Sequence, residues 1–266
     1  MCRSVAGVFA TVALCASSLA SADAVNDKFS LSVGGFLLTT DTTVRVDGTE
    51  QRGTPVNLEH ELGFTNKGSF RLDGYWRFLP RQKIRVMYFD ENRSQTHTIN
   101  EDIVWGDQTF HTDTSIYARL DTLVAELAYE YAFWRGEHYE LCGSVGLHDL
   151  SFRTTLSATG NTLNASATAR ADVNGPLPVF GIHYIWQFTP QLSLDALFEF
   201  FGLKFEQYSG NYQDYQVTVD YMPTKHFGVG LGWNTFVSDV NVDANSFSGN
   251  LRWKYGGLRL YAHFSY

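Results

Sequence analysis

Cysteine, proline and long apolar runs are all scarce in this chain of 266 residues, and each shortage excludes a class of protein. The chain has only 3 cysteines and 6 prolines, beside 23 glycines. After residue 22 there is no run of about 18 apolar residues, the length a transmembrane helix needs. The sequence therefore predicts no helical membrane span beyond that point, and its many glycines suit strands joined by turns.

Positive charge is also in deficit. Lys and Arg total 20 against 28 Asp and Glu, a net charge of −8, so we expect no nucleic-acid partner. Apolar residues make up 44% and aromatic residues 15% of the chain, which is too much for a disordered polymer. Because β-barrels of this length fold as one unit, residues 23–266 are treated as a single domain.

The first 22 residues have the layout of a secretory signal peptide. Arg3 supplies a positive charge, Val5 to Ala16 is apolar, and small residues lead to Ala22. Removal of this segment takes two of the three cysteines with it. Cys142 is then the sole thiol of an exported chain, so no internal disulfide is possible.

Side chains alternate between apolar and polar with a period of two along most of the remaining chain. In residues 69–78, for example, Phe70, Leu72 and Trp76 share one face of a strand and Arg71 the other. With an opening strand from about Phe29 to Arg45, ten candidate strands result.

Eight or twelve strands remain possible. The segments 46–66 and 98–112 could each hide a short hairpin, and Gly256-Gly257 could form a turn or a bulge.

Short and long connections alternate between the candidate strands. Short turns are expected at 79–82, 134–137, 189–191 and 222–225, and longer polar loops at 46–66, 92–112, 157–174, 207–213 and 239–246. Strict alternation predicts an antiparallel up-and-down meander with both chain ends on the short-turn side.

Two features indicate that the apolar face points outward. Aromatic residues gather at one level of that face, as in the girdle of a membrane barrel. The opposite face carries charges that a dry sandwich core could not absorb, whereas a lumen can pair them. The expected interface aromatics are Trp76, Phe78, Tyr131, Phe133, Trp186, Phe188, Tyr221, Phe264 and Tyr266, and the expected lumen charges are Arg71, Asp73, Arg77, Arg85, Glu126, Glu130, Glu140, Asp195, Glu199, Asp220 and Arg259.

These patterns predict an all-β fold, a single antiparallel up-and-down transmembrane β-barrel that is polar inside and apolar outside. Closure of the sheet leaves no strand edge unsatisfied in lipid.

The chain resembles the outer-membrane β-barrel proteins of Gram-negative bacteria. The resemblance rests on residues 1–22, the alternating strands and a last strand, Gly257 to Tyr266, that ends on an aromatic residue. It implies an outer-membrane location, contact with membrane lipid and lipopolysaccharide, and recognition of the last strand by the barrel-assembly machinery. Tyr266 departs mildly from the commoner Phe.

More narrowly, Val56–Phe64 and Phe70–Phe78 resemble a set of uncharacterised proteobacterial outer-membrane barrels. This resemblance implies no catalytic residues.

Motifs that carry chemistry are missing from the sequence. His148 and Ser151 are three residues apart, so on a strand they point to opposite faces and cannot form a nucleophile pair. The histidines are scattered, and Gly228, Gly230 and Gly232 fall on one strand face, where they are expected to make room in the lumen. We expect no catalytic residue, no cofactor and no metal site.

Three functional hypotheses follow. The preferred one is a non-enzymatic barrel with structural or surface-binding work done by long extracellular loops, above all the loop at 46–66 with Glu50, Glu59, His60 and Glu61. The second is a narrow porin-like channel or transporter with selectivity set by the lumen charges. The third is a membrane lipid hydrolase.

Overall fold

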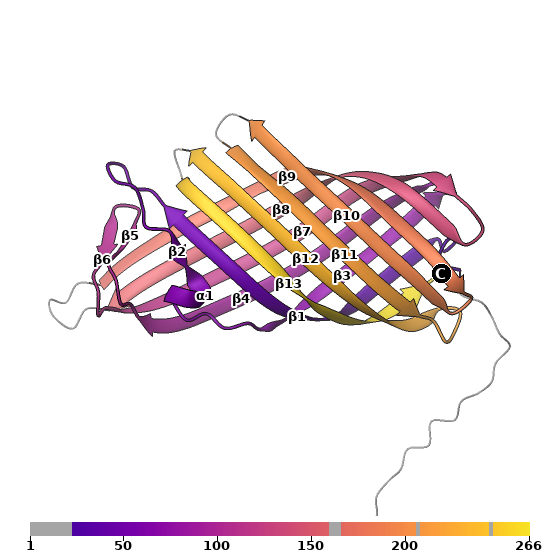
Figure 1. Cartoon of the computed structure of the whole chain (residues 1–266), viewed down its shortest axis with the longest axis horizontal. Helices are drawn as coiled ribbons and strands as arrows, with labels where there is room; N and C mark the ends of the chain where they lie inside the picture. The colour runs from indigo at the N-terminus through magenta and orange to yellow at the C-terminus, as the bar shows by residue number, and fades with distance from the viewer. Residues whose placement is uncertain (1–22, 160–165, 206–207, 245–246) are drawn as a thin grey trace, which may run out of the picture.

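Ten long strands form one antiparallel sheet that closes into a barrel (Figure 1). The computed structural model describes residues 23–159, 166–205, 208–244 and 247–266. The predicted signal peptide, residues 1–22, lies outside them. The barrel strands are β1 (Phe29–Val46), β3 (Gly68–Leu79), β4 (Gln82–Thr98), β7 (Ser115–Arg135), β8 (Tyr139–Thr159), β9 (Ser166–Thr189), β10 (Leu192–Phe205), β11 (Tyr208–Tyr221), β12 (Phe227–Ala244) and β13 (Phe247–Ser265).

The order of the barrel strands is their order in the chain, and β13 pairs with β1 to close the sheet. The up-and-down topology predicted from the sequence is therefore confirmed. Gly256 and Gly257 form neither a turn nor a bulge, because β13 keeps a continuous register with both neighbours through them.

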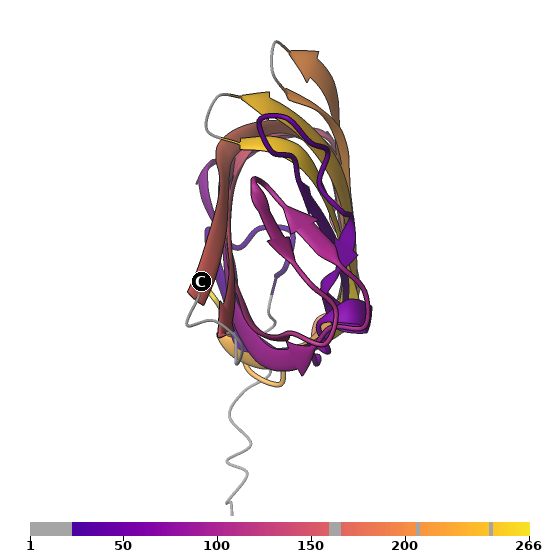
Figure 2. The same ribbon diagram turned by 90° about the vertical axis from the view of Figure 1, so that its left-hand side faces the viewer.

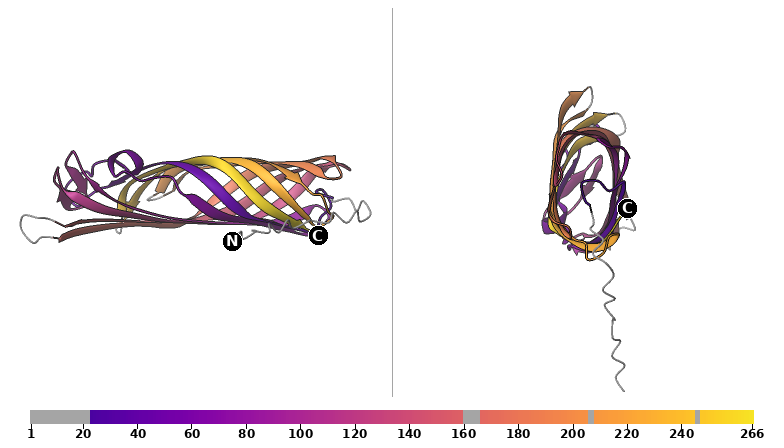
Figure 3. Two further views of the ribbon diagram at one scale, coloured as in Figure 1. Left: turned by 90° about the horizontal axis from the view of Figure 1, so that it is seen from below. Right: turned by 90° about the vertical axis from the view of Figure 1, so that its right-hand side faces the viewer.

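Both described ends of the chain meet at the end of the barrel that carries the short turns (Figure 3). The backbone N–H of Lys28 donates to the carbonyl of Tyr266 at 2.7 Å. The four predicted short turns are found between β3 and β4, β7 and β8, β9 and β10, and β11 and β12. In outer-membrane barrels this end faces the periplasm.

Four of the five predicted long loops are wrong in extent. Residues 92–98 belong to β4, 157–159 and 166–174 to β8 and β9, 208–213 to β11 and 239–244 to β12. The strands continue well past the apolar belt, and the exposed outward side chains there include the polar Arg170, Gln213 and Asn241. In the sequence this arrangement looks like a loop, because the apolar outward face has ended.

The polarity of the two sheet faces inverts along single strands, as β13 shows. Leu258 and Leu260 point outward and are exposed, whereas Arg259 between them is buried. Further along the same strand Trp253 and Tyr255 are buried and Lys254 is exposed. The same alternate residues point inward along the whole strand. The part of the barrel nearer the short turns, here called the lower part, is therefore apolar outside. The part nearer the long connections, here called the upper part, is apolar inside.

A transmembrane strand needs about 9–11 residues, and β9 has 24. The upper part of the strands therefore stands beyond the apolar belt. Its interior holds a cluster of buried rings, here called the aromatic core. Phe236 stacks on Tyr255 with 4.7 Å between the ring centroids, and Phe152 packs edge-on against Trp253, also with 4.7 Å between the centroids. The aromatic core consists of Phe36, Phe89, Phe152, Tyr212, Phe236, Trp253 and Tyr255.

Two long connections fold over the upper opening of the barrel. Residues 47–67 and 99–114, here called the cap, contain β2 (Val56–Asn57), α1 (Leu58–Glu61) and the hairpin of β5 (Ile103–Trp105) and β6 (Gln108–Phe110). Figure 2 shows this hairpin lying across the opening. A hairpin was expected here as a possible pair of extra barrel strands, but it forms a two-stranded sheet of its own and meets the end of β1 through a single bridge between Gly106 and Asp47.

The cap is packed onto the barrel by apolar contacts. Leu58 of α1, Leu62, Ile103 and Trp105 are buried and belong to the same hydrophobic cluster as the aromatic core. Each such side chain contributes about 1.5–3 kcal/mol when it leaves water. The cap is thus a folded part of the barrel interior.

The outer surface of the lower barrel is apolar and rich in exposed rings. Trp76 is 60% exposed and Tyr266 69%, as befits side chains that face lipid rather than protein. Of the aromatics expected at the interface, Trp76, Phe78, Tyr131, Phe133, Trp186, Phe188, Tyr221 and Tyr266 are exposed and Phe264 is partly buried. Among the described residues no helix is both apolar enough and long enough to cross a bilayer.

Glycines of β12 make room inside the barrel. A Cβ on Gly230 would lie 2.1 Å from the ring of Tyr261, and one on Gly232 would lie 2.4 Å from Thr218. The missing side chains let larger residues of β13 and β11 lean across β12, as the sequence led us to expect.

Gly230→Ala is expected to destabilise the barrel by about 1–3 kcal/mol, because Tyr261 must give way. The matched control is Gly35→Ala, since a Cβ there meets nothing within 4 Å. Urea unfolding in detergent micelles, followed by the change in gel mobility of the heated and unheated barrel, measures both. Equal midpoints for the two variants would contradict the packing argument.

Candidate functional site

The lower half of the lumen is filled by ion pairs, with Arg85 at the centre. From β4 its guanidinium reaches Glu126 at 2.7 Å and Glu130 at 2.8 Å, both on β7, and Glu199 on β10. All four side chains are buried. One cation thus ties strands on opposite sides of the barrel together.

A second group of ions lies nearer the short turns. Lys83 contacts Glu130 at 3.1 Å and Glu140 at 2.8 Å, and Arg77 contacts Glu140 at 2.7 Å. The Lys83 side chain is only 1% exposed. Glu130 therefore bridges this group to Arg85, and the two groups form one charged network.

Two histidines complete the charged network on the side of β8, β9 and β10. His183 lies 3.0 Å from Glu130 and 2.8 Å from Asp195. His148 lies 2.9 Å from Glu126, and the hydroxyl of Tyr212 is 3.0 Å from its Nδ1. Each imidazole is held by one carboxylate from a neighbouring strand and one from a strand two places away, with Glu199 lying 3.4 Å from His148.

A third group joins β3 to β11, β12 and β13. Asp73 accepts from Arg71 at 2.9 Å and from Arg259, and Arg71 also donates to Asn234 at 2.8 Å. Gln216 accepts from both arginines, at 2.9 and 2.8 Å. Buried charges tolerate this environment only when paired in this way.

The structure buries nearly every charge that the sequence assigned to the lumen. Asp73 and Asp195 are partly exposed, and the other nine are buried, namely Arg71, Arg77, Arg85, Glu126, Glu130, Glu140, Glu199, Asp220 and Arg259.

Sequence reasoning missed Lys83 and Asp214, which are also buried. Both have the inward parity of charges already assigned, Arg85 and Asp220. Lys83 directly follows the predicted turn at 79–82, and Asp214 directly follows the predicted loop at 207–213, so carrying the alternation to the first residue of each strand would have found them.

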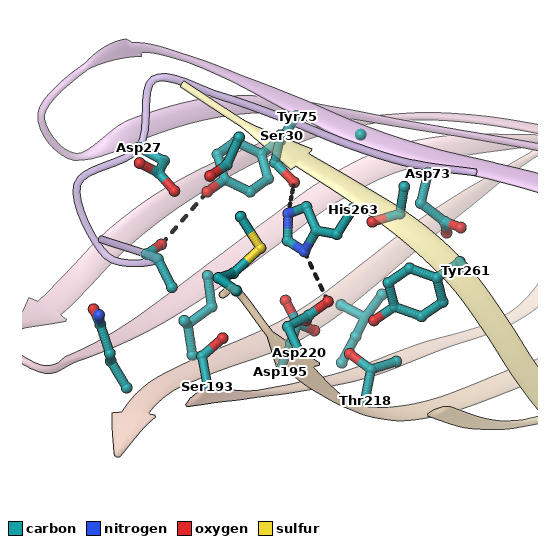
Figure 4. Close-up of a pocket in the computed structure, with 18 of the residues that line it drawn as sticks. Asp27, Ser30, Asp73, Tyr75, Ser193, Asp195, Thr218, Asp220, Tyr261 and His263 are labelled. Atoms are coloured by element: carbon teal, nitrogen blue, oxygen red, sulfur yellow. Dashed lines mark hydrogen bonds and ion pairs between the residues drawn. The ribbon is translucent and has the colours of Figure 1, made fainter. Parts of the chain in front are cut away.

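A cavity of about 80 Å³ lies in the lumen at the short-turn end, lined by Ala24, Pro190 and Gln191 of that end. Three further lining residues form a hydrogen-bonded row (Figure 4). Ser30 Oγ lies 3.0 Å from Nε2 of His263, and Nδ1 of His263 lies 2.7 Å from Asp220. All three come from different strands, β1, β13 and β11.

The remaining candidate groups do not form a site. Glu126, His148 and Glu199 lie close enough together to hold a metal ion, but the guanidinium of Arg85 contacts both carboxylates, which disfavours a second cation there. Ser151 is not buried and His148 is, in keeping with opposite strand faces. Cys142 is buried and donates to Glu140 at 3.2 Å.

Glu59 is a fixed part of the barrel mouth. Its carboxylate accepts from Thr42 N–H at 2.6 Å and from Arg93 at 2.5 Å, with Arg93 itself 1% exposed. Glu50, His60 and Glu61, by contrast, are exposed. Of the loop residues singled out from the sequence, Glu59 therefore anchors the cap and the other three face solvent.

Replacing Arg85 with Met leaves Glu126, Glu130 and Glu199 short of a counter-ion inside the barrel. We expect a loss of roughly 3–5 kcal/mol in the free energy of unfolding. Arg119→Met is the control, because its pair with Asp121 is 53% exposed on the arginine side and should change stability by less than about 1 kcal/mol. Denaturant titration of both variants in micelles tests this, and similar losses would show that the network adds no stability.

No protein-family model matches the sequence, and no curated protein matches it. Among solved structures the chain is similar to the outer membrane protease OmpT from Escherichia coli, with a TM-score of 0.52 and 12% identity over 90% of this chain and 96% of that chain. It is also similar to Ail, the attachment invasion locus protein of Yersinia pestis, with a TM-score of 0.37 and 11% identity over 91% of this chain and 99% of that chain. At these identities the likeness concerns the fold alone. The chain has the fold of the Gram-negative outer-membrane β-barrel proteins.

Proposed function

We propose that this protein is a non-conducting outer-membrane barrel that does its work at the surface-exposed end, where the cap forms a binding surface. The observation that carries the proposal is the filling of the interior at two levels. The charged network occupies the lower half, and the aromatic core together with the cap occupies the upper half.

The filling disfavours the competing channel hypothesis. A path for ions would have to pass between Arg85 and its three carboxylates, and then between Trp253, Phe236 and the other rings of the aromatic core. A barrel of about this strand number has an interior that its own side chains can fill. The lumen charges therefore act as structural cross-links in this proposal.

The cap offers a rigid, acidic surface. Asp107 accepts from Thr49 N–H at 2.7 Å, which ties the two cap segments together. That bond lowers the pKa of Asp107, and the N–H of Thr112 lowers the pKa of Asp102, so both carboxylates stay ionised at neutral pH. The exposed acids of the cap are Glu50, Glu61, Glu101, Asp102, Asp107 and Asp113, and its exposed bases are Arg52 and Lys67.

This charge balance favours a cationic partner, such as a basic peptide or protein segment. The surrounding apolar belt supports contact with outer-membrane lipid, and lipopolysaccharide remains a proposed neighbour of the upper barrel. Recognition of the last strand by the barrel-assembly machinery also stays a proposal, supported by the exposed Tyr266 at its end.

The purified barrel is expected to be electrically silent in planar bilayers. Insertion is checked by protease protection of the bilayer-embedded strands, and an open porin in the same membrane serves as the positive control. Discrete conductance steps from the inserted barrel would overturn the closed interior and favour the channel hypothesis.

Binding of decalysine to the barrel in micelles tests the cap. Affinity should fall roughly tenfold when Glu50, Glu61, Glu101 and Asp113 are changed to their amides, and wild-type binding should weaken as salt rises to about 150 mM. The control changes Glu137 and Asp149, exposed acids outside the cap, to amides. Binding that survives the cap changes, or that equals binding to decaglutamate, would contradict an acidic docking surface.

A further inference from the structure

Ser30, His263 and Asp220 have the arrangement of an activated nucleophile. The hydroxyl of Ser30 faces Nε2 of the imidazole at 3.0 Å, and the carboxylate of Asp220 faces Nδ1 at 2.7 Å. With a proton on Nδ1, directed at Asp220, Nε2 is free to accept the Ser30 proton. The two ring nitrogens are thus used in the order that nucleophilic catalysis requires.

This row of three residues depends on two glycines of β12, the strand that lies between β11 and β13. In the ladder His263 lies opposite Gly228, and Asp220 lies opposite Gly230. Neither glycine carries a side chain to separate the imidazole from the carboxylate. His263 can therefore reach across β12, and the side chain of Ser30 on β1 approaches it from the other neighbouring strand.

The row borders open space. Ser30, His263 and Asp220 all line the cavity of about 80 Å³ at the short-turn end, as Figure 4 shows. That volume holds several water molecules or a short acyl chain. Because the cavity lies inside the barrel, it opens away from the lipid, and a substrate would be a small water-soluble ester.

We infer that Ser30 is the nucleophile of an acyl-transfer site that hydrolyses small soluble esters at the short-turn end, with His263 as general base and Asp220 holding the imidazole. This function is separate from the proposed work of the cap, which lies at the opposite end. Failure of one leaves the other untouched.

The reaction balances as an ester hydrolysis. Ser30 Oγ bonds to the ester carbonyl carbon while its proton passes to Nε2 of His263. The bond to the alcohol oxygen breaks, and the alcohol leaves with that proton. Water then attacks the acyl-serine and gives a proton to Nε2, the acid leaves, and Oγ recovers the proton.

Tyr75 is the side-chain donor available to the developing oxyanion. It lies directly opposite Ser30 in the pairing of β1 with β3 and lines the same cavity. Its present bond, from the hydroxyl to the carbonyl of Ala24, is long at 3.4 Å and readily exchanged. The oxyanion needs a side-chain donor here, because the backbone N–H groups of paired strands already donate to the neighbouring strand.

The test is covalent labelling of the folded barrel with a small organophosphorus fluoridate, followed by mass spectrometry of the peptide that contains Ser30. Folding of each variant is first verified by gel mobility before and after heating. Labelling is expected on Ser30, absent in Ser30→Ala and unchanged in Ser32→Ala, a second serine that lines the cavity.

Two further variants separate activation from mere exposure of a hydroxyl. Asp220→Asn should slow labelling by roughly 100-fold or more, because the imidazole loses its orienting carboxylate. Asp195→Asn, which removes the carboxylate beside His183 in the same cavity, should slow labelling far less than Asp220→Asn, because Asp195 pairs with His183 rather than with His263. Absence of label on the folded wild-type barrel, or equal rates for the two asparagine variants, would overturn the inference.

Discussion

The hydrogen-bond ladder between β1 and β13 is the constraint on which the rest of the structure depends. In hydrocarbon an unpaired strand edge leaves backbone N–H and C=O groups without partners, each at a cost of several kcal/mol. Pairing Ser30 with Ser265 through to Val46 with Gly249 removes both edges at once. The closed sheet then encloses a narrow interior, and whatever the inward positions carry must be satisfied inside that space.

The interior meets this demand differently at its two levels. Where the outer wall faces lipid, the inward side chains are charged, and Arg85 compensates three carboxylates that water could not reach freely. Above the apolar belt the outer wall is polar and hydrated, and the inward positions return to apolar rings such as Trp253 and Phe236. The upper barrel is thus built like a water-soluble domain on a membrane-embedded base, and the cap supplies the residues that close its core.

The fold could be predicted from the sequence because the alternation of side chains is local. Leu72 and Trp76 share a face by geometry alone, and so do the charges at Arg71 and Arg77, whatever pairs with them. The extent of the strands could not be predicted, because it depends on where the outer wall leaves the membrane. Beyond that level the pattern inverts, so polar outward residues at 208–213 and 239–244 resemble loops although they continue β11 and β12.

The candidate site lay beyond sequence reasoning for a related reason. Ser30 and His263 are 233 positions apart, and His263 and Asp220 are separated by 43. No spacing rule connects such positions. Ser30 meets His263 only because β13 pairs with β1, and His263 meets Asp220 only because β12 has glycines at the crossing. The same closure that satisfies the backbone in lipid therefore also brings the serine to the histidine, so a barrel that failed to close would lose the row of three residues together with its wall.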